Sequence, residues 1–213
     1  MYPARVVAIQ KVDVVPQVSG EILEVAFENG AIVKEGDILY RLDPIKYEAA
    51  VKNAESKLAE CRAAVKYAEL SYERHKKLRD TRAVSLDAVD NALSHRDSAR
   101  AALAAAQADL VAARDNLAHC TIVAPISGKV GTTAKTKGNY VTEGSGVLVT
   151  LVQTSPVRVS FSLANRDFLS MFQAKLSNLQ ENAVVELTLS DGTALGEKGE
   201  IEYFENVADE RTD

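Results

Sequence analysis

Pro16–Ile22, with the sequence PQVSGEI, returns in outline at Pro125–Val130 as PISGKV. A second block, Asn29–Gly36 with the sequence NGAIVKEG, returns at Lys137–Gly144 as KGNYVTEG. One offset that holds across both blocks indicates an internal duplication. The matched positions all differ by 108 residues and are Val18 and Ile126, Gly20 and Gly128, Gly30 and Gly138, Val33 and Val141, Glu35 and Glu143, and Gly36 and Gly144.

Each copy has the pattern of short strands joined by turns. Val12, Val14 and then Val18 alternate with polar residues, as in a half-buried strand, and Glu21–Val25 continues the pattern. Gly30 and Gly36 lie where the chain has to reverse, and glycine tolerates the positive φ of a tight turn. Neither copy can bury its apolar face alone. We therefore expect two lipoyl-like halves, residues 12–43 and 119–152, that face each other in a small β-sandwich.

Residues 44–118, between the two halves, are predicted to form a long antiparallel coiled-coil hairpin that bends near Arg82. Asp43 and Pro44 open it as an N-cap acceptor followed by a proline at the first helical position. Each arm is expected to be roughly 50 Å long, because an α-helix rises about 1.5 Å per residue. Apolar residues recur at coiled-coil spacing. This predicted seam consists of Tyr47, Val51, Ala54, Leu58, Cys61, Val65, Ala68 and Tyr72 on the outgoing helix and Val89, Ala92, Ala99, Leu103, Ala106, Leu110, Ala113 and Leu117 on the returning helix, with Arg96 as the discordant residue.

Composition and charge exclude several classes of function. The net charge of −5 argues against nucleic acid as a general partner. No stretch approaches the roughly 20 apolar residues of a membrane span, and Met1–Arg5 lacks the features of a signal peptide. We expect that a targeting segment was removed or that the chain is an excised part. Cys61 and Cys120 are expected to lie roughly 25 Å apart along the arms, too far for a disulfide, with Cys61 acting as a small apolar seam residue.

The C-terminal residues 153–213, together with residues 1–11, are expected to form an incomplete β-barrel. The fold class is therefore α+β: a lipoyl-like β-sandwich interrupted by a helical hairpin and followed by a partial barrel. The patterns that predict the barrel are strands at Arg5–Ile9, Val157–Leu163, Val185–Leu189 and Ile201–Tyr203, a turn at Asp191–Gly192, and a short helix from a cap at Asn165 through Leu176.

This architecture resembles the periplasmic adaptor proteins, also called membrane fusion proteins. The motifs that carry the resemblance are Pro16–Gly20, Ala124–Gly128 and Ser155–Val159, the last leading into the barrel. In adaptors of resistance-nodulation-division pumps, the hairpin bend carries an Arg, a Leu and a Ser at fixed spacing. Arg74, Leu78 and Ser85 match that pattern, so the resemblance implies that these three residues meet an outer-membrane channel.

The resemblance also implies a place and partners. The parent protein would lie in the periplasm, anchored to the inner membrane, and link an inner-membrane transporter to an outer-membrane channel in a tripartite multidrug efflux pump. Hexamers are the family expectation, and the chain itself is expected to be soluble. We expect the chain to depart from the family at its ends, in its closing barrel strands, its membrane-proximal domain and its lipidated or membrane-inserted N-terminus.

The predicted tip residues also have structural explanations. Ser85 can be the N-cap of the second helix, with Asp87 favourable in its first turn. Leu78 can close the seam, but a Leu at an apex has little to pack against, which favours a contact. A basic cluster can be a solvated surface or can steer the tip towards acidic groups or helix-end carbonyls. The supporting basic residues around Arg74 are Lys76, Lys77, Arg79 and Arg82, broken only by Asp80.

Two alternatives compete with a pump adaptor of this type. One is an adaptor of an ATP-driven exporter or type I secretion system, which the arginine–leucine–serine spacing disfavours. The other is a biotinyl or lipoyl carrier modified at Lys46, but a carrier presents its lysine on a tight β-turn, whereas Lys46 is expected in a first helical turn. An enzyme is not predicted, because His75, His95 and His119 have neither metal-ligand spacing nor a nucleophile set. No cofactor and no metal site are expected.

Overall fold

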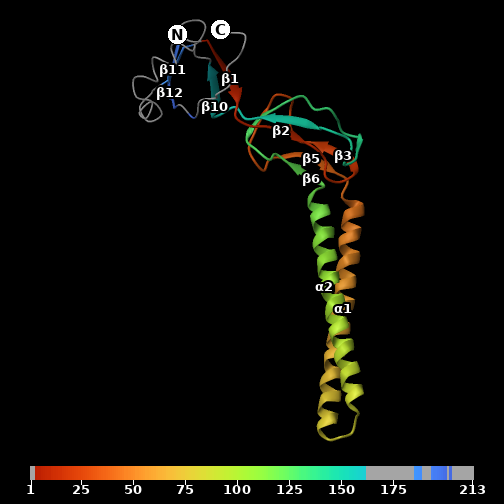
Figure 1. Cartoon of the computed structure of the whole chain (residues 1–213). Coiled ribbons are helices and arrows are strands. Elements are labelled where there is room, and N and C mark those ends of the chain that lie inside the picture. The colour runs from red at the N-terminus through yellow and green to blue at the C-terminus, as the bar shows by residue number, and fades with distance from the viewer. Residues whose placement is uncertain (1–2, 162–184, 189–192, 201, 203–213) are drawn as a thin grey trace, which may run out of the picture. The chain divides into compact units, whose positions relative to one another are not determined.

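The computed structural model describes residues 3–161, 185–188, 193–200 and 202. Figure 1 shows the whole chain. It divides into two compact units, Ala8–Val157 and a second one built from Met1–Val7 and Arg158–Asp213.

The larger unit contains two four-stranded antiparallel sheets. The first has the order β2 (Lys11–Val14), β9 (Val149–Val152), β7 (Gly128–Val130) and β4 (Ile32–Val33). The second has the order β6 (Thr121–Val123), β5 (Ile38–Leu42), β3 (Gly20–Val25) and β8 (Tyr140–Val141).

The two repeat copies exchange strands between these sheets. Each sheet takes two strands from the first copy and two from the second: β2 and β4 join β7 and β9, and β3 and β5 join β6 and β8. The sequence predicts two halves that face each other, whereas the structure builds each face from both halves. The reason is that strands pair between the copies. β4 of the first copy pairs with β7 of the second, and β8 of the second copy pairs with β3 of the first. The edge strand of each sheet therefore pairs with a strand from the other copy.

The core lies between the two sheets and repeats the internal symmetry. Ile22 and Val130 are equivalent and both buried, as are Val33 and Val141. The largest fully buried side chain is Tyr40. Its hydroxyl lies 2.7 Å from Thr133 Oγ1 and donates to the Leu148 carbonyl at 3.3 Å. Its one polar group is therefore satisfied inside an otherwise apolar core.

Two long helices, α1 (Ile45–Asp80) and α2 (Leu86–Ala118), occupy the region between β5 and β6. They lie side by side and run in opposite directions (Figure 1). The first helix begins one residue later than predicted, at Ile45, but the carboxylate of Asp43 still accepts a hydrogen bond from the Ile45 N–H at 3.0 Å. Arg82, in the intervening turn, has a positive φ of 58°, which places the reversal at the predicted residue.

The root of the hairpin is joined to neighbouring strands. β5 and β6 pair directly, and the Leu42 N–H donates to the Cys120 carbonyl at 2.8 Å. In addition, the Tyr47 hydroxyl of α1 donates to the Ser19 carbonyl at 2.8 Å. The two helices therefore leave and re-enter the sandwich at adjacent positions, so the insertion does not interrupt either sheet.

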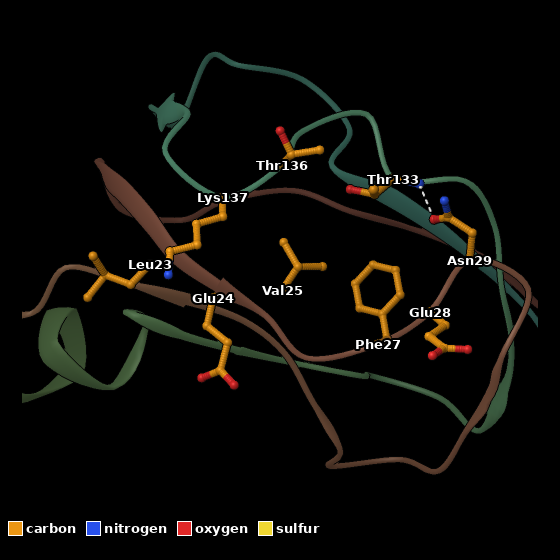
Figure 2. Close-up of a pocket in the computed structure, with 9 residues that line it drawn as sticks. All are labelled: Leu23, Glu24, Val25, Phe27, Glu28, Asn29, Thr133, Thr136 and Lys137. Atoms are coloured by element: carbon orange, nitrogen blue, oxygen red, sulfur yellow. Dashed lines mark hydrogen bonds between the residues drawn. The ribbon is translucent and has the colours of Figure 1, made fainter.

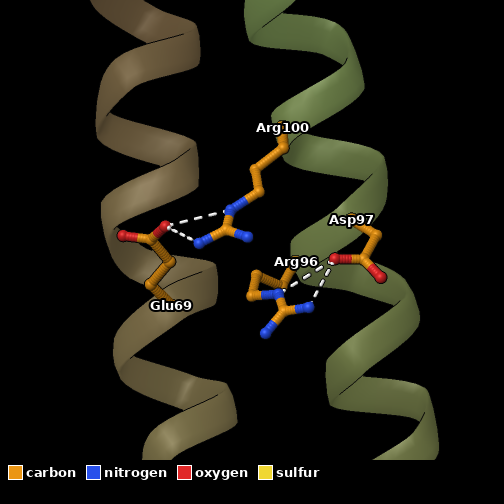
Figure 3. A network of polar contacts seen from close by, with 4 residues as sticks. All are labelled: Glu69, Arg96, Asp97 and Arg100. Atoms are coloured by element: carbon orange, nitrogen blue, oxygen red, sulfur yellow. Dashed lines mark hydrogen bonds and ion pairs between the residues drawn. The ribbon is translucent and has the colours of Figure 1, made fainter.

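The seam between the helices follows the predicted spacing. Leu58 and Cys61 of α1 pack with Ala106 and Leu110 of α2 in one buried cluster. Every other predicted seam residue is buried or half-buried. Ion pairs flank the seam across the helices: Arg100 to Glu69 at 2.7 Å (Figure 3) and Arg114 to Glu55 at 2.8 Å.

Arg96, the discordant seam residue, is accommodated by its neighbours. Its guanidinium carbon lies 4.6 Å from the ring centroid of Tyr72 on α1, within the range of a cation–π contact. The same guanidinium donates two hydrogen bonds to Asp97 on its own helix, at 2.7 and 2.9 Å (Figure 3). The guanidinium of Arg96 is therefore paired with a carboxylate, while the methylene groups of its side chain occupy the seam position.

Among its described residues, the smaller unit contains two short two-stranded pairings. β1 (Ala4–Ala8) is shifted by one residue from the predicted N-terminal strand, Arg5–Ile9, and pairs with β10 (Val157–Phe161). β11 (Val185–Thr188) pairs with β12 (Ala194–Gly199). β12 is not predictable from strand alternation, because its glycines and charged residues hide the pattern. The predicted helix from Asn165 to Leu176, the turn at Asp191–Gly192, and Leu163, Leu189, Ile201 and Tyr203 lie outside the described residues.

A substitution at Gly128 tests the close approach of the β7 and β9 backbones. A Cβ at this position would collide with the Val152 carbonyl oxygen, which belongs to a paired backbone. We expect Gly128→Ala to lower the free energy of unfolding by about 2 kcal/mol or more. Gly144→Ala is the matched control, because nothing lies within 4 Å of its added Cβ, and it should change stability by less than about 0.5 kcal/mol. Urea denaturation would measure both; equal losses would contradict the predicted collision.

Candidate functional site: the hairpin tip

The tip consists of the last turns of α1, the residues 81–85 and the first turn of α2. The turn is closed by local hydrogen bonds. The Arg82 N–H donates to the Arg79 carbonyl at 2.8 Å, and the Ala83 N–H donates to the Leu78 carbonyl at 2.9 Å. The Thr81 hydroxyl also donates to Leu78, at 2.8 Å. The backbone of the tip therefore has a defined shape on which side chains are presented.

Ser85 is the N-cap of α2. Its backbone is extended, and its hydroxyl oxygen accepts a hydrogen bond from the Ala88 N–H at 3.2 Å. This confirms the structural role predicted from the sequence, with Asp87 in the first turn of the helix. The side chain is exposed, so the cap leaves Ser85 accessible to a partner.

Two leucines are exposed at the tip. Leu78, a predicted contact residue, has 39% of its surface exposed, and Leu86 has 57% exposed. Leu86 was not among the contact residues predicted from the sequence. The signal was its position directly after the cap: a first-turn residue has no preceding helical turn against which to pack. Exposed leucines on a narrow turn present apolar area that a partner could bury.

The basic residues of the tip are all turned to solvent. Within the described part of the chain none of them has an ion-pair partner. Lys77 and Arg79 lie in the last turn of α1, where positive charge is favoured by the helix dipole. His75 is different, because its Nδ1 lies 2.8 Å from the Ser71 carbonyl on its own helix. The exposed, unpaired cations are Arg74, Lys76, Lys77, Arg79 and Arg82.

Lys46 lies in the first turn of α1, as the sequence favoured, and not on a tight β-turn. It is exposed, and its Nζ lies 4.6 Å from the centroid of the Tyr47 ring. A carrier lysine has to reach outward from a turn to deliver its cofactor. This geometry does not provide such a turn.

The sandwich also carries a shallow depression (Figure 2). It has a volume of about 470 Å³ and includes a hydrogen bond from the Thr133 N–H to Asn29 Oδ1 at 3.0 Å. Its lining mixes apolar side chains with carboxylate, amide, hydroxyl and amine groups. It is lined by Leu23, Glu24, Val25, Phe27, Glu28, Asn29, Thr133, Thr136 and Lys137.

The described residues contain neither a metal-ligand cluster nor a membrane-spanning helix. None of these residues form a group of three or more His, Cys, Asp or Glu that could hold a metal ion. Among the same residues no helix combines the length and the apolar character needed to cross a membrane.

Residues 10–153 match the family model described as "RND MFP, barrel-sandwich hybrid domain". The chain belongs to the membrane fusion protein family of resistance-nodulation-division pumps. The match spans both sheets and the hairpin of the larger unit. It therefore covers all the elements that hold the tip.

Named relatives extend the similarity to nearly the whole chain. The chain is 37% identical over 216 residues to the multidrug efflux pump subunit AcrA of Escherichia coli K12, covering 99% of this chain and 54% of that protein. It is 34% identical to the multidrug/solvent efflux pump periplasmic linker protein MepA of Pseudomonas putida, covering 99% of this chain and 53% of that protein. The chain thus spans about half the length of these two relatives.

A solved structure shares the fold. The MacA–MexA chimeric protein, which contains the Pseudomonas aeruginosa MexA alpha-hairpin domain, aligns with a TM-score of 0.56 and 28% identity. The alignment covers 78% of this chain and 56% of that one.

The cap at Ser85 can be tested separately from any partner contact. Ser85→Ala removes the acceptor for the Ala88 N–H, and we expect a loss of about 1 kcal/mol in unfolding free energy. Ser85→Asp is the control, because aspartate is an equally good N-cap and the stability should be retained. Urea denaturation followed by far-ultraviolet circular dichroism would measure both. Equal stabilities of the alanine variant and the parent chain would show that the cap contributes nothing.

Proposed function

We propose that this chain is the channel-reaching part of a periplasmic adaptor subunit in a resistance-nodulation-division tripartite multidrug efflux pump. The parent protein links an inner-membrane transporter to an outer-membrane channel, and the hairpin tip docks on the channel. Family membership and the names of the relatives support the pump assignment. The observation that carries the docking role is the tip, where Leu78 and Leu86 are exposed beside unpaired cations.

The chemistry of the tip fits a helical protein partner. Arg74 and its basic neighbours would attract carboxylates or the carbonyl end of a helix on the channel, and attraction of this kind raises the rate of association and fixes the orientation. The leucines would lose their water on docking and supply the apolar part of the interface. Ser85, held by the Ala88 N–H, can still donate its hydroxyl proton to a carbonyl of the partner.

The sandwich and the barrel region take a mechanical role in this proposal. They would stack laterally between copies into a ring, a hexamer in the assembled pump, so that substrates pass through a sealed conduit. The proposed organisation is an N-terminal barrel strand at residues 1–11, lipoyl-like halves at 12–43 and 119–152, the coiled-coil hairpin at 44–118 and a barrel domain at 153–213. In the parent protein this part would lie in the periplasm, anchored to the inner membrane.

No observation favours either alternative, the adaptor of an ATP-driven exporter or secretion system or the carrier modified at Lys46. The matching family model describes the resistance-nodulation-division class, which does not favour an ATP-driven exporter or a secretion adaptor. Lys46 lies in a helix, where a carrier lysine has no turn from which to extend.

Photo-crosslinking tests the docking directly. A photoreactive amino acid at Ser85 of the full-length parent, in its native cell, should capture an outer-membrane channel protein, identified by mass spectrometry. The same amino acid at Val111, which is 68% exposed on α2 outside the tip, should not capture the channel. Adducts from Ser85 that contain only the adaptor itself or a cytoplasmic enzyme would overturn the proposal.

Charge reversal at Arg74 tests the basic contribution. We expect Arg74→Glu to weaken channel binding by about tenfold, because an attraction becomes a repulsion at the interface, and to lower the drug resistance that the pump confers. Lys66→Glu makes the same change in charge on an exposed position of α1 away from the tip and should leave both unchanged. Equal effects of the two substitutions would show that net charge, and not the tip, matters.

A further inference from the structure

The exchange of strands creates two equivalent edges with opposite charge. At the first, Ile32 of β4 pairs with Lys129 of β7. At the second, Tyr140 of β8 pairs with Glu21 of β3. The offset of 108 residues that relates the repeat copies maps Ile32 onto Tyr140 and Glu21 onto Lys129. The two sites are thus the same structural position, each with a large apolar residue beside a charge, but the sign of the charge is inverted.

The neighbouring pairs show that this inversion is confined to the outer surface. Val33 pairs with Gly128 at the first edge and Val141 pairs with Gly20 at the second, and all four residues are buried. Successive side chains of a strand point to opposite sides. Each exposed pair therefore points away from the core, on the outer side of its own sheet. Because the sheets pack against each other, the two exposed pairs lie on opposite outer faces of the sandwich.

Both exposed pairs have the character of contact surfaces. Ile32 is 78% exposed and Tyr140 is 64% exposed, among the highest values for large apolar side chains in the described residues. Within that part of the chain, neither Lys129 nor Glu21 has an ion-pair partner. Lys46, a cation in the first turn of α1, has its ammonium over the Tyr47 ring and forms no ion pair with Glu21. Each site therefore offers exposed apolar area and a charge still available for an intermolecular pair.

We propose that these two faces bind each other between neighbouring copies of the chain. The Ile32–Lys129 face of one copy would contact the Tyr140–Glu21 face of the next. Because the two faces differ and lie on opposite sides, the contact is head-to-tail, and such contacts close into rings when the rotation per copy allows it. The inference specifies the lateral contact of the proposed adaptor ring and rests on that proposal for its biological setting.

Complementary charge reversals test the pairing in the purified chain. Lys129→Glu alone and Glu21→Lys alone each place like charges across the contact, and we expect each to weaken self-association by about tenfold. An equimolar mixture of the two variants should restore it, because every contact in an alternating assembly again joins opposite charges. Sedimentation velocity over a concentration series would measure all three samples beside the parent chain.

Every outcome of this experiment decides the pairing. Recovery in the mixture after both single variants weaken association supports it, since in a contact between two copies of one face one of the single variants would leave the charges of that contact unchanged. A mixture that behaves like the single variants overturns it. So do single variants that associate like the parent chain, and so does a parent chain that stays monomeric at every concentration.

A crosslinking experiment tests which faces meet. A short bis-maleimide should join Ile32→Cys copies to Tyr140→Cys copies in a mixture, and should join neither variant to itself. Cys61 and Cys120 are buried, and burial raises the pKa of the Cys120 thiol, so the parent chain gives the background. Leu70→Cys, 58% exposed on the hairpin, replaces Tyr140→Cys in the control mixture. Equal products in both mixtures, or from Ile32→Cys alone, would overturn the head-to-tail contact.

Failure of this inference can be told apart from failure of the proposed function. The substituted faces lie on the sandwich, and the tip with Ser85 is unchanged. If the face variants behave as the parent chain while Ser85 still captures a channel protein, then only the lateral contact is wrong. If Ser85 captures no channel protein, the docking proposal fails whatever the faces do.

Discussion

Cross-pairing between the repeat copies is the constraint on which the rest of this structure depends. β4 of the first copy pairs with β7 of the second, and β8 of the second pairs with β3 of the first. Neither copy then has a complete sheet of its own, although many residues separate them along the chain. Closing such a long loop costs entropy, but the cost grows only slowly with loop length. The shared core between the sheets offsets it.

The hairpin can be long because its root is narrow. Its two helices leave and return at paired strands, with the Leu42 N–H bonded to the Cys120 carbonyl. Beyond that root the arm is stabilised by its own seam, in which Leu58 and Leu110 are buried. A self-sufficient arm on a fixed base can present a tip at a distance. This is the mechanical property that the proposed docking role requires.

Some of the candidate site followed from local sequence and some did not. The cap at Ser85 was predictable, because a serine that precedes a helix and follows a turn has one strongly preferred hydrogen bond. Arg96 looked like an error in the heptad pattern, since periodicity alone cannot show the ring of Tyr72 across the seam. Leu86 was missed because exposure at a turn depends on the backbone path. Residues Asn165–Leu176 lie outside the described part of the chain, so the expected helix there remains a prediction.

The sequence by itself determined the duplication, the positions of the two helices and the seam between them, because each follows from the spacing of residues along the chain. Glycine pairs at a constant offset and apolar residues three and four apart identify these features without knowledge of contacts. Only the tertiary structure decided that each sheet draws strands from both copies, because strand partners distant in sequence leave no local periodicity. That arrangement also set Lys129 beside Ile32 and Glu21 beside Tyr140, two neighbours that no spacing along the chain could have revealed.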